Sequence, residues 1–190
     1  MGRSRMYGTA ALVLALVAAC ATAGEGLLEE ARGVAGSVPP RLLAVLQEEM
    51  AAGGPEGAIG VCRDKAPQLA QEASERSGWQ VRRVSLGNRN PRAVPDAWER
   101  TVLEDFDRRV AAGESPAGME RGEVVAEAGV DYYRYMMALP VQPLCLACHG
   151  SEAGLGQAVR DRLATDYPDD RATGYELGQV RGAMTIRRPL

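Results

Sequence analysis

The pentapeptide CLACH at residues 145–149 constrains this chain more than any other feature, because His149 is the only histidine among 190 residues. Two cysteines spaced C-x-x-C with a histidine directly behind them are the standard attachment site of a c-type haem. Cys145 and Cys148 would form the two thioether bonds, and His149 would bind the iron as the proximal ligand. We therefore expect a fold that encloses one covalently attached haem c.

Three other uses of these residues fit the sequence less well. A zinc site needs about four ligands, and the chain has neither a second C-x-x-C nor another histidine. A redox dithiol favours a thioredoxin-like βαβ context and does not need the histidine. A disulfide between Cys145 and Cys148 would close too short a loop to stabilise the fold much. Haem attachment remains the best interpretation.

The second axial ligand of such an iron cannot be a histidine of this chain. It can be a methionine, a cysteine or a lysine, or the position can stay open for water or a gas. Cys62 is the one cysteine outside both the C-x-x-C-H motif and the N-terminal region, and an unpaired cysteine in an exported protein calls for an explanation. It also fits a small buried hydrophobe on a helix. Five methionines remain after export: Met50, Met119, Met136, Met137 and Met184.

Residues 1–23 have the layout of a secretory signal. Arg3 and Arg5 precede an apolar run at 10–19, which is too short to span a bilayer because a spanning helix needs about 20 apolar residues. Val-Ala-Ala before Cys20 resembles a lipobox, whereas Ala-Thr-Ala at 21–23 is a site for ordinary signal peptidase. We expect a periplasmic protein and favour a lipid anchor at Cys20 over a soluble form.

Behind the signal, residues 24–37 are small and polar and predict a linker, and residues 38–190 are long enough for one domain. Removal of Arg3 and Arg5 takes the formal net charge from −3 to −5. A mildly acidic chain without basic clusters gives no support for binding nucleic acid or anionic lipid. We expect a redox or signalling protein as partner, and membrane contact only through the lipid anchor.

Hydrophobic periodicity predicts an α+β domain. Pro67 should kink or restart the helix that contains it, and alternation places Tyr133, Tyr135, Met137 and Leu139 on one face of a strand. Residues 169–178 predict a solvated loop. The predicted helices cover 39–50, 56–78, 96–113 and 157–167, and the predicted strands cover 79–86, 121–128, 130–139 and 179–189.

Five segments carry a family resemblance over about residues 38–190. They are AIGVC (58–62), AP (66–67), VSLGNRNPRAVPDAWE (84–99), VQPLCLACHG (141–150) and YPDDRATGYELGQVRGA (167–183). In this order they resemble a single-haem family with a PAS-like fold, in which a cysteine and a histidine bind the iron of a c-type haem. The resemblance implies a PAS-like antiparallel sheet with N-terminal helices, haem bound near the C-terminal part, and Cys62 as the distal ligand.

The resemblance also implies periplasmic redox or small-ligand sensing, or low-potential electron transfer. A Cys62 thiolate would stabilise ferric iron, and its release on reduction would open a site for a small gas. The alternatives are an ordinary electron-transfer cytochrome c with a methionine ligand and a haem peroxidase. The peroxidase is less favoured because no second histidine can act as an acid–base group, so we expect no enzyme. Arg83, Arg89 and Arg92 are either partners of the haem propionates or ordinary surface arginines.

Overall fold

The computed structural model describes residues 24–190. The predicted signal at 1–23, with the lipidation candidate Cys20, lies outside these residues. Within the described range, no helix is both long enough and apolar enough to cross a membrane.

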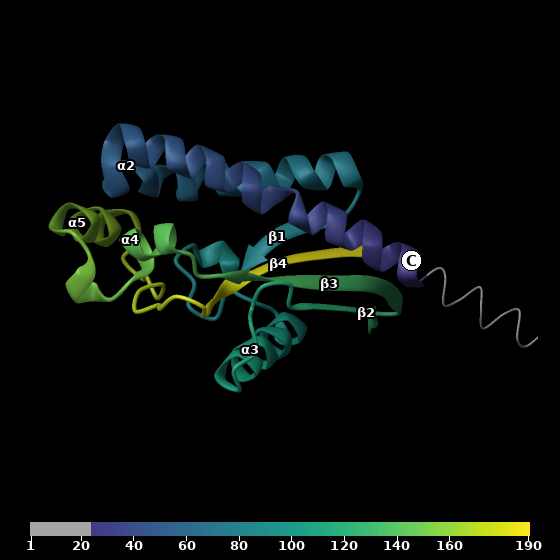
Figure 1. The fold of residues 1–190 in the computed structure, drawn as a ribbon. Helices are drawn as coiled ribbons and strands as arrows, with labels where there is room; N and C mark the ends of the chain where they lie inside the picture. Colours follow the sequence, from purple (N-terminus) through teal and green to yellow (C-terminus); the bar gives the residue numbers. More distant parts are fainter. Residues whose placement is uncertain (1–23) are drawn as a thin grey trace, which may run out of the picture.

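A four-stranded antiparallel sheet forms the centre of the fold (Figure 1). The strand order is β1-β4-β3-β2, so the C-terminal strand lies inside the sheet. Strands β2 and β3 form a hairpin whose turn residues Ala128 and Gly129 both have positive φ, as tight hairpin turns require. The predicted α+β class, with an antiparallel sheet and N-terminal helices, is confirmed. The strands are β1 (Gln80–Val84), β2 (Glu120–Glu127), β3 (Val130–Pro140) and β4 (Val180–Pro189).

The long helical segment α2 (Val38–Ser77) folds back on itself over one face of the sheet (Figure 1). The break predicted near residues 51–55 occurs at Gly54, whose φ of 70° and ψ of −176° lie outside the helical region. An ion pair of 2.7 Å between Arg41 and Glu72 joins the two arms. At Pro67 the backbone stays helical, so the predicted kink or restart there is wrong. Tertiary packing overrides the local preference, because the arm packs on the sheet around this position.

The predicted linker at residues 24–37 is also wrong, because residues 24–36 are helical and pack on the sheet. Ala31 and Ala35 are fully buried, and these two small residues on one helix face allow the helix to approach closely. The indole N–H of Trp79 donates to Glu30 at 2.9 Å, and Arg188 pairs with the same carboxylate at 2.7 Å. The folded domain therefore includes residue 24.

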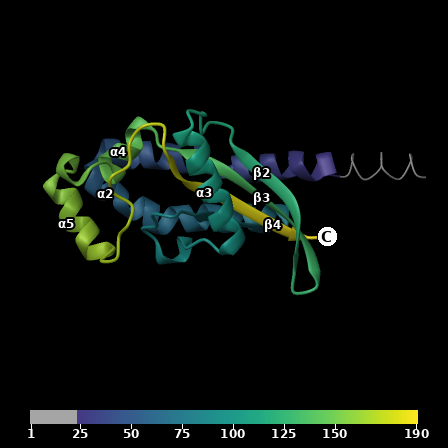
Figure 2. The same ribbon diagram turned by 90° about the horizontal axis from the view of Figure 1, so that it is seen from below.

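Side chains of β3 alternate between two cores, as predicted. Tyr133 and Tyr135 pack under the N-terminal helices, whereas Met136 and Ala138 face α3 (Ala97–Ala111). Figure 2 shows α3 on the face of the sheet opposite α2. The predicted helix at 96–113 is present as α3, which contributes Trp98, Val102, Phe106 and Val110 to the second core.

The segment between β3 and β4 carries the C-x-x-C-H motif. It lies at the end of the sheet next to the turn of α2 (Figure 1). Ile59 of α2 packs against α5 in a third buried cluster, which connects the helical arm containing Cys62 to this segment. The short helices of the segment are η2 (Pro143–Cys145), α4 (Leu146–His149), η3 (Glu152–Gly154) and α5 (Gln157–Asp166).

Candidate cofactor site

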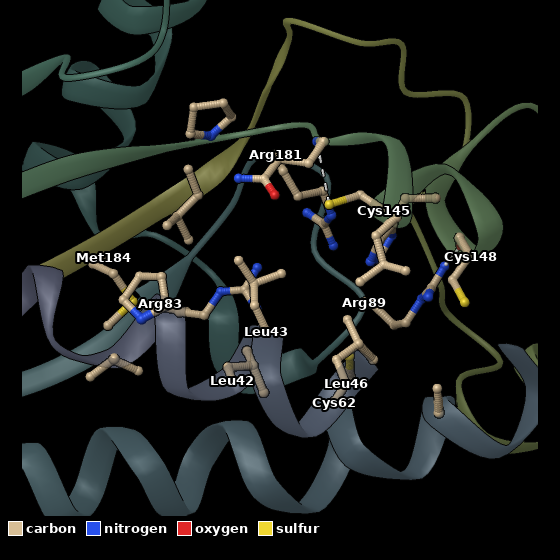
Figure 3. Close-up of a pocket in the computed structure, with 18 of the residues that line it drawn as sticks. Leu42, Leu43, Leu46, Cys62, Arg83, Arg89, Cys145, Cys148, Arg181 and Met184 are labelled. Atoms are coloured by element: carbon tan, nitrogen blue, oxygen red, sulfur yellow. Dashed lines mark hydrogen bonds between the residues drawn. The ribbon is translucent and has the colours of Figure 1, made fainter. Parts of the chain in front are cut away.

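A cavity of about 240 Å³ lies between α2, the end of the sheet and the C-x-x-C-H motif (Figure 3). Cys62, Cys145, Cys148 and His149 all lie on its wall, so the structure brings the four predicted cofactor residues together. An apolar cleft with a few convergent polar groups is the usual form of a cofactor site. Much of the remaining wall is apolar, with Val38, Leu42, Leu43, Leu46, Leu139 and Met184.

A second cavity of about 420 Å³ adjoins the first and has a more polar wall, including Ser85, Asn88, Asn90 and Arg92. A flat cofactor with an apolar body and acidic side chains, such as haem, fits this pairing of an apolar and a basic compartment. We call the wall that the two cavities share the junction. Its residues are Cys62, Arg83, Arg89, His149 and Arg181.

His149 is held in the form that binds a metal. Its Nδ1 lies 2.7 Å from the carbonyl oxygen of Ala172, and because a carbonyl can only accept, the ring proton is on Nδ1. Burial, together with Arg181 and Arg89, lowers the pKa of His149 well below its usual range, although the bond to Ala172 acts in the opposite direction. The imidazole is therefore neutral at pH 7, with the lone pair of Nε2 available to a metal.

Residues 169–176, which we call the histidine clamp, hold the end of the motif. The amide of Tyr175 donates to the carbonyl of His149 at 2.9 Å, and the amide of Gly174 donates to the carbonyl of Gly150 at 2.8 Å. The Tyr175 ring meets the imidazole edge-on, with 6.5 Å between the ring centroids. Four of the eight clamp residues are exposed, in keeping with the predicted solvated loop, but Ala172 is fully buried. The clamp therefore positions the histidine from outside the motif.

Cys145 and Cys148 are unpaired thiols, so the structure contains no disulfide between them. The amide of Gln142 donates to Sγ of Cys145 at 3.5 Å, and Sγ of Cys148 lies 3.8 Å from the carbonyl oxygen of Pro55. Burial raises the pKa of Cys148 to about 11, against the opposing effect of Arg89. Cys148 is therefore a protonated thiol at neutral pH. Among residues 24–190, no group of three or more histidine, cysteine or acidic side chains could hold a metal ion, so the zinc alternative gains no support.

Cys62 lies on the arm of α2 that follows Gly54, and its side chain is half-buried. It belongs to none of the three buried clusters found in the described part of the chain. The neighbouring Arg63 pairs with Asp166 at the end of α5, with 3.1 Å between the charged atoms. This contact joins the helical turn that carries Cys62 to α5. The position on the junction supports the role of ligand over that of a buried hydrophobe.

The methionines that could replace Cys62 as the distal ligand lie on two different faces of the sheet. Met119 and Met136 pack against α3, on the face away from the motif. Cys62 borders both cavities, as His149 does, whereas the remaining methionines border only the apolar cavity. The methionines on the cavity wall are Met50, Met137 and Met184.

The three arginines predicted as propionate partners occupy different positions. Arg89 is committed to the protein, since it pairs with Asp170 at 2.9 Å and donates to the carbonyl of Cys148 at 2.7 Å. Arg92 is exposed beside the polar cavity. Arg83 borders both cavities. Sequence reasoning missed Arg181, whose only signal was an arginine within the otherwise small and apolar run at 180–184.

Comparison with known proteins identifies the family. The Tll0287-like family model (Tll0287) matches residues 16–189. The crystal structure of the cyanobacterial heme-protein Tll0287 matches with 30% sequence identity and a TM-score of 0.54, over 68% of this chain and 71% of that chain. No curated protein matches. The resemblance to a single-haem family is thereby confirmed, and the chain belongs to the Tll0287-like family.

Proposed function

We propose that this chain carries one c-type haem, bound covalently through Cys145 and Cys148, with His149 and Cys62 as the two axial ligands of its iron. One observation carries the proposal: all four residues lie on the wall of one apolar cavity, although Cys62 is far from the motif in sequence. The relative Tll0287 is a heme-protein, which supports the same cofactor here.

The residues around the cavity determine what such a haem would do. When bound, the haem would supply one-electron exchange at its iron. The hydrogen bond from Nδ1 of His149 to Ala172 fixes the ring and strengthens Nε2 as a ligand. A thiolate ligand from Cys62 would lower the reduction potential relative to a methionine ligand. These properties support a low-potential redox centre.

We assign the protein to electron transfer or to redox or small-ligand sensing, and not to catalysis. Within the described residues, no carboxylate and no second histidine line either cavity, so a peroxidase would lack a distal acid–base group. The signal-like N-terminus supports a periplasmic location, with Cys20 as the lipidated residue. A redox or signalling protein would then be the partner.

The axial ligands can be tested by spectroscopy on protein expressed with the c-type haem maturation machinery. Cys62→Ala should lose the low-spin thiolate signature in absorption and electron paramagnetic resonance spectra, while covalent haem is retained. Met184→Leu is the matched control, because Met184 also lines the apolar cavity. An unchanged spectrum in Cys62→Ala, or a ligand change in Met184→Leu, would sink the assignment of Cys62.

The covalent attachment can be tested separately. The double variant Cys145→Ala, Cys148→Ala should lose haem when the polypeptide is denatured, whereas Cys62→Ala should keep it. Haem that leaves the wild-type chain on denaturation would contradict attachment. Carbon monoxide binding to the reduced wild type would favour the sensing role, and its absence together with rapid electron exchange would favour the carrier.

A further inference from the structure

Arg181 occupies an irregular position in strand β4. Leu139 of β3 lies opposite Gly182, but the next residue, Pro140, lies opposite Val180, so Arg181 has no partner in the register. A bulge of one extra residue changes the direction of a side chain, and bulges are common beside active sites. Arg181 is thus set apart from the regular alternation of the strand.

Gly182 makes this bulge possible. Its φ is 149°, and a Cβ atom at this position would lie 2.4 Å from the carbonyl oxygen of Val84. Any larger residue would therefore collide with the backbone of the neighbouring strand β1. Gly182 allows the bulge, and Arg181 is the residue whose side chain the bulge redirects.

One edge of the Arg181 guanidinium is held firmly by the protein. Its Nη1 donates to the hydroxyl of Ser85 at 2.9 Å and to the carbonyl of Gly87 at 3.0 Å. The Ser85 hydroxyl lies 2.9 Å from the carbonyl oxygen of Arg181 itself and can donate to it. The Tyr175 ring of the histidine clamp lies 5.0 Å from the guanidinium carbon. These contacts fix the group at the junction, on the wall of both cavities. Figure 3 shows Arg181 on the wall of the apolar cavity.

The rest of the guanidinium lacks a partner. The residue is only 7% exposed, and its Nε is buried without a hydrogen-bond acceptor. Among residues 24–190, no carboxylate pairs with Arg181, whereas Arg89 beside it is neutralised by Asp170. Burial and the nearby Arg83 lower the pKa of Arg181 to about 10, so it remains a cation at neutral pH. A buried cation without an anion is costly, and a guanidinium fork matches a carboxylate.

We propose that Arg181 is the carboxylate-binding residue of the cofactor site, and that a haem propionate binds its Nη2, the nitrogen that is neither bonded to the protein nor enclosed by it. The inference rests on the proposed function, since the propionate comes from the proposed haem. Arg83 lies on the same junction and is placed to assist, whereas Arg89 is already paired. Arg181 is a positioning residue: it fixes the acidic edge of the haem, and its charge stabilises the added electron of the reduced state.

The test uses haem-loaded protein and three variants: Arg181→Gln, Arg181→Lys and the control Arg100→Gln, since Arg100 is exposed on α3 and lines neither cavity. Arg181→Gln should keep covalent haem and the axial-ligand spectrum but have a lower midpoint potential. Its propionate bands in the resonance Raman spectrum should also shift. Arg181→Lys should restore most of the wild-type midpoint potential, because the positive charge is kept. Its propionate bands should still be shifted, because a point charge replaces the forked guanidinium. Arg100→Gln should match the wild type in both measurements.

The outcomes separate this inference from the proposed function. Absence of covalent haem in the wild-type protein would refute the proposed function itself. If haem and both axial ligands are present but neither Arg181 variant shifts the propionate bands, the inference alone is overturned. Acetate distinguishes the source of the carboxylate. A saturable spectral response of the wild type to acetate that is lost in Arg181→Gln would show that the site takes free carboxylates and would overturn the propionate assignment.

Discussion

Nδ1 of His149 and the carbonyl oxygen of Ala172 lie 2.7 Å apart, and this contact belongs to a closed chain of polar contacts. The amide of Ala172 donates to Asp170 at 2.8 Å, and Asp170 also accepts from Arg89 at 2.9 Å. Arg89 returns to the motif through the carbonyl of Cys148 at 2.7 Å. The orientation of the imidazole therefore depends on the histidine clamp as much as on the motif.

Asp170→Ala should destabilise the protein by about 3 kcal/mol, because it leaves Arg89 as an uncompensated buried cation. The side chains of Arg89 and Asp170 are 7% and 12% exposed. Urea unfolding measures the loss, and Asp169→Ala is the matched control because Asp169 is exposed beside it. Equal losses in the two variants would contradict the role given to the ion pair.

Gly150→Ala should destabilise the end of the motif by about 1–3 kcal/mol, as overpacking in a fixed backbone does. A Cβ atom at this position would lie 2.6 Å from the carbonyl oxygen of Leu146. Gly156→Ser is the control, since Gly156 has open space and serine is favoured at the N-cap that it occupies. Thermal unfolding and the yield of haem-loaded protein both report the effect. A Gly150→Ala protein as stable as the control would show that the backbone relaxes there.

Substitution by alanine of the two adjacent glycines at the turn of α2 should change the stability of the protein in opposite directions. Gly54→Ala should cost about 1–3 kcal/mol because φ is 70° and ψ is −176°. Gly53→Ala should stabilise the protein by about 0.5–1 kcal/mol, since Gly53 is helical and its position is open. Denaturant unfolding decides between them. A Gly54→Ala protein at least as stable as the wild type would mean that Gly54 does not define the angle between the arms that carry Leu42 and Cys62.

Asp96 should make folding sensitive to acid. Burial alone would raise the pKa of Asp96, but the hydrogen bond from the Glu99 amide and the Arg134 guanidinium together lower it below its usual value. The folded-state pKa is thus below the unfolded-state pKa of about 3.9, so its contribution is complete above that pH and is lost as pH falls through the folded value. Asp96→Ala should cost about 1–2 kcal/mol at pH 7, since Asp96 also caps α3.

The pH dependence provides the control for this prediction. Asp96→Asn keeps the N-cap acceptor but not the charge, so it should lose less stability at pH 7 than Asp96→Ala and should lack the acid-dependent part. Unfolding at a series of pH values down to about pH 2 measures both effects. A wild type and an Asp96→Asn variant that lose stability in parallel over this range would refute the assignment.

The sequence predicted what depends on local pattern and missed what depends on tertiary contact. The motif, the periodic helices and the alternating strand β3 are encoded by neighbours in the chain, so their prediction needed no fold. The helix at residues 24–36 was missed because small residues predict flexibility unless a sheet packs on them. Ala172 acts through its backbone carbonyl, which no side-chain pattern reveals. Arg181 depends on a bulge between strands β3 and β4, and register is a property of the folded sheet.

The helix at residues 24–36 would keep the domain close to the membrane if the proposed lipid anchor is present. If Cys20 carries the lipid, the chain from Cys20 to residue 24 spans at most about 14 Å, and the contacts of Glu30 hold the helix to the sheet. The helix at residues 24–36 begins beside the C-terminus, at the opposite end of the sheet from α4 and α5 (Figures 1 and 2). The domain would then stand on the bilayer by one end with its cofactor at the other. Its partner would approach from the aqueous side of the envelope, and not from within the lipid.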